Sequence, residues 1–304
     1  MPQRAVVVGA GVVGLSCAVR LLDAGHRVDV LARDLPLETT SSVAAAIWHP
    51  YLAFPQDRVT AWGQAAYAEF ARQAAEGVDG VAMRRGTELM REPTPDPWWI
   101  DAVRGLDRVR PHEPYADAWS FVTPVIDMPR YLAGLTDRVI DAGGTITRMA
   151  LASLPEAPLV VNCSGLGSRL LAGDASTTPV RGQVVVVEQF GLDEWWLGEK
   201  AAAGVPTYVI PRTTDVVLGG TDDAGAWSRT PSRVAADDIL RRASVLVPAV
   251  ADARVVRHRV GLRPARPEVR LERVGDVIHC YGHGGSGVTL SWGCADEVLA
   301  LAEK

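Results

Sequence analysis

The chain has 304 residues, of which 48% are hydrophobic and 22% are charged. These fractions are ordinary for globular proteins, so they exclude a disordered or a fibrous chain. The 31 basic and 36 acidic residues leave a formal charge of -5, which gives no electrostatic reason to expect nucleic acid or a membrane as a partner.

The start of the chain predicts one β-α-β unit. An apolar strand over Ala5–Val8 is followed by a glycine turn, a helix over Val12–Ala24 and a second strand within residues 26–34. Apolar residues recur along the helix at a spacing of three and four, as packing on a parallel sheet requires. The length of the connection suits a right-handed crossover.

The next hundred residues give weaker signals. Residues 39–54 predict a loop and then a short helix or strand, residues 57–73 predict a helix, and residues 84–92 have strand-like ends. The segments 93–99 and 110–114 are rich in proline and predict connections.

Strands and helices alternate again in the second half. The expected elements are a helix at 129–142, strands at 145–151 and within 158–168, strands at 184–188, 208–211 and 216–219, a helix at 235–246, and a strand, glycine turn and helix within 277–304. The three strands after residue 182 are separated by turns and predict an antiparallel sheet.

These elements predict an α/β fold with two discontinuous domains. A Rossmann-like nucleotide-binding domain with a parallel sheet is expected from residues 1–50, 137–180 and 272–304. An inserted substrate-binding domain with an antiparallel sheet is expected from residues 51–136 and 181–271.

A dinucleotide-binding pattern opens the chain. Gly9, Gly11 and Gly14 form G-x-G-x-x-G between a strand and a helix, where backbone amides and the helix dipole attract a pyrophosphate. Asp34 ends the second strand, at the place of the acid that binds a ribose hydroxyl. This pattern alone does not separate NAD from FAD.

A second glycine-rich turn lies between the last strand and the last helix. Residues 282–287 read GHGGSG, and a backbone turn of this kind can bring amides to a ring system. A flavin gains electron density at N1 and the C2 carbonyl on reduction, so it benefits from such donors. The second turn therefore favours a flavin.

Several side chains could bind a substrate. Arg263 is flanked by Gly261 and Pro264, and a fixed guanidinium suits a carboxylate, although a surface ion pair is the ordinary role of an arginine. Tyr208 and Tyr51 could donate to the same group. No acidic residue lies at a spacing that would orient His49 or His283, so the sequence predicts no catalytic base.

The counts of lysine and cysteine exclude two kinds of chemistry. Lysine occurs only at positions 200 and 304, which argues against an enzyme that forms an imine on lysine. Cysteines 17, 163, 280 and 294 are widely spaced, without a CxxC pair or a histidine that completes a zinc site. They predict reduced core thiols and no metal.

Eight motifs in order resemble one family, the D-amino-acid oxidases, which are flavoenzymes related to D-aspartate oxidase. The motifs are VVVGAGVVGL at the start, TTSSVAAAIWHPY at 39–51, VVNCSGLGS at 160–168, RGQVVVVE at 181–188, TYVIP at 207–211, LGGT at 218–221, VGLRPARPEVRLE at 260–272 and YGHGGSGVTLSWGCADEV at 281–298. They span nearly the whole chain.

The resemblance implies a non-covalently bound FAD, held by residues from both glycine turns and the segments between them. The implied cofactor-binding residues are Gly9, Ala10, Gly11, Val12, Val13, Gly14, Arg33, Asp34, Thr39, Thr40, Ala45, Ala46, Ile47, Ala150, Ser164, Gly165, Arg263, Gly284, Gly285, Ser286, Gly287, Val288 and Thr289.

The resemblance also implies the reaction: oxidative deamination of D-amino acids by hydride transfer to the flavin, with molecular oxygen as acceptor. The products are a 2-oxo acid, ammonia and hydrogen peroxide. Arg263 would bind the substrate carboxylate together with Tyr208, and the Gly285 carbonyl would accept from the amine. Tyr51, whose hydroxyl could donate to a carboxylate, is expected as a further substrate contact. No protein base is expected.

Two departures from the family pattern change the expected specificity and access. Gly204 stands where mammalian members have a lid tyrosine, which predicts a more open site. Asp222 and Asp223 follow LGGT where D-aspartate enzymes have a basic residue. Two acids there would repel a side-chain carboxylate, so neutral D-amino acids are the expected substrates.

The chain shows no signal-peptide pattern and ends in LAEK rather than the peroxisomal SKL, so a cytoplasmic location is expected. Relatives often dimerise, which makes a homodimer an expectation of the resemblance. The alternatives are a glycine or sarcosine oxidase, an NAD-dependent dehydrogenase, and a nucleotide-binding module without catalysis.

Overall fold

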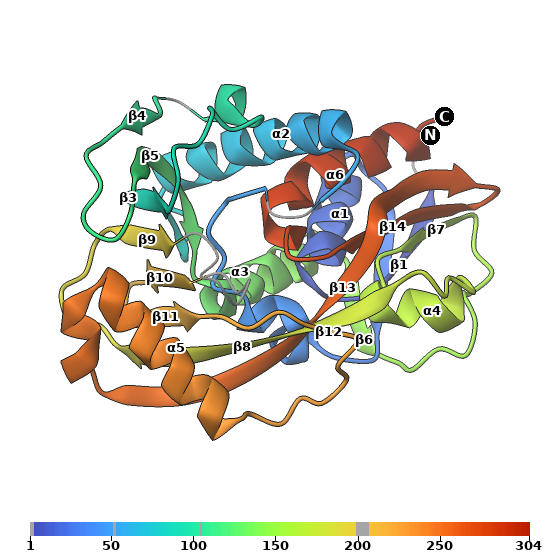
Figure 1. The fold of residues 1–304 in the computed structure, drawn as a ribbon. Coiled ribbons are helices and arrows are strands. Elements are labelled where there is room, and N and C mark those ends of the chain that lie inside the picture. Colours follow the sequence, from blue (N-terminus) through green and yellow to red (C-terminus); the bar gives the residue numbers. More distant parts are fainter. Residues whose placement is uncertain (1–2, 51–52, 104, 199–206) are drawn as a thin grey trace.

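The computed structural model describes residues 3–50, 53–103, 105–198 and 207–304. Strands from all parts of this range form one continuous 14-stranded sheet with helices on its faces (Figure 1). The strands are β1 (Arg4–Val8), β2 (Arg27–Ala32), β3 (Val81–Met90), β4 (Asp107–Arg108), β5 (Asp117–Ile126), β6 (Thr145–Arg148), β7 (Leu159–Asn162), β8 (Thr178–Glu188), β9 (Trp195–Gly198), β10 (Thr207–Pro211), β11 (Asp215–Gly219), β12 (Asp223–Ala224), β13 (Val255–Val274) and β14 (Val277–His283). The helices are α1 (Val12–Asp23), α2 (Gln56–Ala75), α3 (Met128–Asp141), α4 (Ser168–Leu171), α5 (Arg233–Leu246) and α6 (Gly287–Ala302).

One half of the sheet is parallel. Its order is β14-β7-β1-β2-β6, and each neighbouring pair runs in the same direction. The strands β1 and β7 are fully flanked and consist almost wholly of buried apolar residues, as expected of a sheet covered on both faces. Helices α1, α3 and α6 pack around the largest core of the protein.

The other half is mostly antiparallel. Strands β9, β10, β11, β8 and β13 pair in this order, and α5 packs against β8, β10 and β11 (Figure 1). The α/β fold with a parallel and an antiparallel part is thus confirmed. The strand β8 begins at Thr178 rather than near residue 184, because its first residues pair with β12 and β13.

Strand β13 joins the two halves. It pairs with β8 along one side and with β14 along the other, in both cases antiparallel. The boundaries expected at 180/181 and 271/272 fall inside β8 and β13, so the backbone hydrogen bonds cross from one part to the other. The division into domains stays a prediction.

Two long strands were not expected from the sequence. Strand β5 contains Pro124, and β13 contains Pro264 and Pro267; proline lowers the apparent strand signal because it cannot donate to a ladder. In the part of the chain that the structure describes, no helix is both long and apolar enough to cross a bilayer.

A half-buried carboxylate, that of Asp174, ties the loop after α4 to strands β13 and β14. Asp174 accepts hydrogen bonds from Arg266 of β13 and from the Tyr281 hydroxyl of β14, each at 2.9 Å. Burial alone would raise the pKa of Asp174, but hydrogen bonds from Ser176, Tyr281 and Arg266 outweigh it, so the pKa lies well below its usual range. The charged form is therefore the stable one in the folded protein.

We expect Asp174→Asn to lower the free energy of unfolding at pH 7 by about 1–3 kcal/mol, the cost of losing a half-buried charged acceptor. A depressed pKa gives stability that is complete above the unfolded value of about 4 and is lost as the pH falls further. The free energies of unfolding of the variant and the parent protein, measured by urea unfolding, should therefore approach each other below about pH 4.

The matched control is Asp193→Asn, because the Asp193 side chain is 89% exposed and bonds only at the surface to Arg84. This variant should have the same free energy of unfolding as the parent at pH 7 and at about pH 3. If Asp174→Asn lowers the free energy of unfolding by the same amount from pH 7 to about pH 3, the ionised Asp174 carboxylate does not stabilise the fold as proposed.

Candidate active site

A cavity of about 780 Å³ extends from the first glycine turn to Arg263. Its walls come from the parallel half of the sheet, the segment after β2, and the long strands β8 and β13. The predicted site residues that line it are Gly9, Ala10, Gly11, Val12, Val13, Gly14, Arg33, Asp34, Thr39, Thr40, Ala150, Ser164, Gly165, Tyr208, Arg263, Gly284, Gly285, Gly287 and Val288.

The first glycine turn is held so tightly that only glycine fits. Gly9 has a φ of 112°, and a Cβ atom there would lie 2.4 Å from the carbonyl oxygen of Cys163. A Cβ atom at Gly14 would lie 2.0 Å from the carbonyl oxygen of Gly9. The turn therefore brings bare backbone to the cavity, directly before the N-terminus of α1.

Two helix N-termini face this one cavity. Residues 12 and 13 begin α1, residues 287 and 288 begin α6, and all four line the cavity. The amides of a first helical turn and the helix dipole stabilise negative charge. One end can therefore hold a pyrophosphate while the other supplies amides to an electron-rich ring.

Part of the cavity wall is charged. Arg33 and Asp34 follow β2 and form an ion pair of 2.6 Å. Both line the cavity beside Ala150. An acid at the end of the second strand is the place at which this fold binds a ribose hydroxyl.

Arg263 belongs to β13 and also lines the cavity. Its Nη1 atom donates to the Thr221 carbonyl oxygen at 3.0 Å and lies 3.4 Å from Asp222 Oδ1. The side chain is only 21% exposed. The guanidinium is thus fixed by the backbone after β11, as a bidentate carboxylate site requires.

The Arg263 guanidinium lies over Gly182 in the neighbouring strand β8. A Cβ atom at Gly182 would come within 2.5 Å of Nη2 and 2.7 Å of Nη1. Glycine at this position leaves the room in which the guanidinium lies, so Gly182 is a positioning residue that sequence reasoning did not include among the site residues.

Tyr208 of β10 lies within hydrogen-bond reach of Arg263 and lines the same cavity. Its ring occupies the space over Gly219 and Gly220, where any Cβ atom would clash with it. Burial raises the pKa of the Tyr208 phenol, and the Arg263 guanidinium offsets this only in part. Tyr208 is therefore protonated at neutral pH and can donate a hydrogen bond.

The second glycine turn is fixed to the strand that carries Arg263. The Gly284 amide donates to the Pro264 carbonyl oxygen at 2.9 Å, and Gly282 and Gly284 have φ values of 86° and 54°. Gly285 lies between this bond and α6 and lines the cavity. The turn and Arg263 are consequently held at a constant relative position.

Some predicted residues do not line the cavity. Among the described residues these are Ala45, Ala46, Ile47, Ser286 and Thr289. Ile47 bridges instead to Val125 of β5, and Thr289 Oγ1 contacts the backbone of His49. Tyr51 and Gly204 lie outside the described residues.

Ser41 was missed by sequence reasoning. Its Oγ atom accepts from the Val12 amide at 3.0 Å and would lie 3.1 Å from a Cβ atom at Gly11. Its place beside a hydroxyl-rich segment, TTSS, was the available signal. Ser41 closes the first glycine turn from the side of the segment after β2.

The expectation that no acid orients His49 was wrong. His49 Nε2 lies 3.2 Å from Glu88 Oε2 in β3, a partner that is 39 residues away in sequence and brought near by the fold. Neither residue lines the cavity that contains Arg263.

Comparison with known proteins places the whole chain in one family. The family model described as FAD dependent oxidoreductase, DAO, matches residues 4–301. The chain is 49% identical to D-amino-acid oxidase from Rubrobacter xylanophilus, over 98% of this chain and 95% of that protein. It is 37% identical to D-aspartate oxidase from Homo sapiens, over 99% of this chain and 95% of that protein.

The fold is shared more widely. The structure superposes on glycine oxidase from Bacillus cereus ATCC 14579 with a TM-score of 0.83, 20% identity, and coverage of 99% of this chain and 94% of that one. At this identity the likeness concerns the fold.

FAD is the cofactor of the chain, and the cavity has the features that it needs. Bare glycine backbone and two helix N-termini meet the requirements of a pyrophosphate and an electron-rich ring. The chain belongs to the DAO family of FAD dependent oxidoreductases.

Proposed function

We propose that the chain oxidises D-amino acids with neutral side chains to 2-oxo acids, with release of ammonia and hydrogen peroxide. The observation that carries this proposal is the place of Arg263: a fixed guanidinium in the same cavity as the dinucleotide-binding turn. The oxidation needs a bound amino acid and molecular oxygen.

FAD, when bound, would supply the hydride acceptor of the oxidation and the route of the two electrons to oxygen. The residues that would hold it are those of the first glycine turn, Ser41, the pair Arg33 and Asp34, and the second glycine turn. The N-termini of α1 and α6 would stabilise its negative charge.

Arg263 would bind the substrate carboxylate by a charge-assisted bidentate pair. Tyr208, which keeps its proton, would donate to the same carboxylate. The Gly285 carbonyl would accept from the substrate amine. With carboxylate and amine fixed, only one enantiomer directs its α-hydrogen into the cavity, which accounts for a preference for D-amino acids.

The charged and titratable groups of the cavity support a reaction without a protein base. Among the described lining residues the carboxylates are Asp34, paired with Arg33, and Glu38, paired with Arg148. His283 is 4% exposed. The acid next to Arg263 is Asp222, which lies 3.4 Å from the Nη1 atom and pairs with it. Because each of these carboxylates is engaged by an arginine, the proposed role of the chain is to position the substrate rather than to abstract its proton.

The two acids after β11 have different partners. Asp223 binds Arg181 at 2.9 Å, whereas Asp222 lies beside Arg263. The negative charge of Asp222 partly neutralises the guanidinium and would repel a second carboxylate on the substrate. This supports neutral over acidic D-amino acids.

A glycine or sarcosine oxidase is the main alternative. The likeness to glycine oxidase is a likeness of fold, whereas the likeness to D-amino-acid oxidase extends to 49% of the residues. Purified protein should therefore produce more peroxide from D-alanine than from sarcosine; the reverse order would favour the alternative.

Arg263→Ala should retain FAD and lose activity on D-alanine. A charge-assisted hydrogen bond contributes about 1.5–3 kcal/mol, so loss of two should lower kcat/KM at least about a hundredfold. Arg263→Lys is the matched control, because it keeps the charge without the bidentate geometry and should recover only part of the loss. Unchanged kcat/KM in Arg263→Ala would exclude the carboxylate role.

Gly182→Ala should fold and bind FAD, because the group that its Cβ atom displaces is the end of a flexible side chain. The displaced guanidinium should lower kcat/KM by on the order of a hundredfold, as a shift of ~1 Å typically does. Gly134→Ala in α3 is the control, since nothing lies within 4 Å of its Cβ position. Equal activity of the two variants would count against the positioning role.

The enzyme should have a higher kcat/KM for D-methionine than for D-aspartate. Asp222→Asn should lower the ratio of the two kcat/KM values about fivefold. Two like charges about 4 Å apart in water repel by ~1 kcal/mol, and this repulsion is what the substitution removes. Asp223→Asn should change the ratio less, because Arg181 neutralises Asp223. A parent enzyme that prefers D-aspartate would overturn the proposed specificity.

A further inference from the structure

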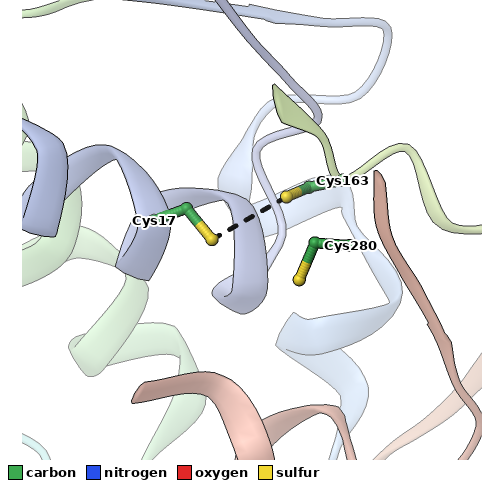
Figure 2. A group of neighbouring side chains, drawn as sticks. All are labelled: Cys17, Cys163 and Cys280. Atoms are coloured by element: carbon green, nitrogen blue, oxygen red, sulfur yellow. Dashed lines mark hydrogen bonds between the residues drawn. The ribbon is translucent and has the colours of Figure 1, made fainter. Parts of the chain in front are cut away.

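The fold gathers cysteines that are far apart in the sequence. Cys17 lies in α1, Cys163 follows β7 and Cys280 lies in β14, and their sulfur atoms are all within 4.8 Å of one another. The sulfur atoms of Cys17 and Cys163 face each other at 3.9 Å (Figure 2). The sequence spacing predicted separate core thiols, because it could not show this convergence.

This spacing matches a metal site. Three sulfur atoms placed 2.3 Å from a central ion in one plane are about 4.0 Å apart, and slightly closer when the ion lies out of the plane. The observed distances need only small movements of the side chains to reach this geometry. Thiolate sulfur is a soft ligand and selects soft ions.

We propose that Cys17, Cys163 and Cys280 bind one soft d10 cation, of the class that includes Cu(I), Zn(II) and Cd(II). On binding, three S–H bonds break, three metal–sulfur bonds form, and three protons pass to the solvent. No electron is transferred, so the step needs no oxidant.

An ion can reach this site through the FAD cavity. Cys163 and Cys280 both line that cavity, and Cys163 is partly exposed. A second group, Cys280, His283 and Cys294, shares one thiol with the first. Two of its members also line the cavity, and Cys280 Sγ lies 3.9 Å from His283 Nε2, but all three members are buried. The partly exposed Cys163 and the set of three thiols favour the first group.

The site would be coupled to the first glycine turn. The Cys163 carbonyl oxygen packs against Gly9, and the Cys163 side chain packs against Gly14. A bound ion would join α1, the segment after β7 and β14, which together carry both glycine turns. Binding to the folded state alone would raise the melting temperature of the protein.

Cd(II) is the probe. The reduced protein is incubated with Cd(II) until bound cadmium is constant, once with its FAD and once after reversible removal of FAD, because the route to the thiols runs through the FAD cavity. The ultraviolet charge-transfer absorption of Cd–thiolate bonds is recorded in both forms. We expect one thiolate-bound Cd(II) for each chain and a higher melting temperature. Cys163→Ala and Cys17→Ala should each weaken binding more than about a hundredfold, beyond the usual effect of losing an outer partner of a metal site.

Cys294→Ala is the matched control, because it removes a buried thiol of the second group only and should bind Cd(II) like the parent. The melting temperature and FAD content without Cd(II) show whether each variant is folded. If Cys17→Ala does not fold, Cys17→Ser takes its place. Absence of the thiolate absorption in the parent would overturn the proposal. So would binding that is lost in Cys294→Ala and retained in the Cys17 and Cys163 variants.

Discussion

The pairing of β8 with β13 is the constraint on which the site depends. It joins the parallel and antiparallel parts in one sheet and sets Gly182 against the guanidinium of Arg263. Because β13 continues into the pair with β14, the same strand also positions the second glycine turn. The arginine proposed to bind the substrate and the glycine turn proposed to bind the cofactor therefore belong to strands joined by backbone hydrogen bonds.

The nucleotide-binding half was predictable because its signals are local. The strand, the glycine turn and the helix over residues 4–23 follow one another directly. For Gly9 and Gly14 the structure shows the steric reason, because a Cβ atom at either would clash with backbone. The last strand, turn and helix follow the same rule. Parallel strands buried on both faces read as continuous apolar runs, which makes them easy to recognise.

The remaining features depend on contacts between distant segments. The pair of His49 with Glu88, the seat of Arg263 over Gly182 and the group of three cysteines each join residues from different strands or helices. No spacing rule contains such information, and the prolines of β5 and β13 hide the strands that create these contacts. Resemblance to the family singled out Arg263 as a candidate for binding the substrate. The structure adds why residue 182 is glycine, because a Cβ atom there would meet the Arg263 guanidinium.

Anaerobic titration of the yellow holoenzyme tests the central claim directly, because it follows the reacting cofactor and needs no second substrate. The account predicts that D-alanine bleaches the flavin absorbance and that L-alanine at the same concentration leaves it unchanged. Equal bleaching by both enantiomers, or none by either while FAD remains bound, would contradict a cavity in which Arg263 and the second glycine turn orient a D-amino acid.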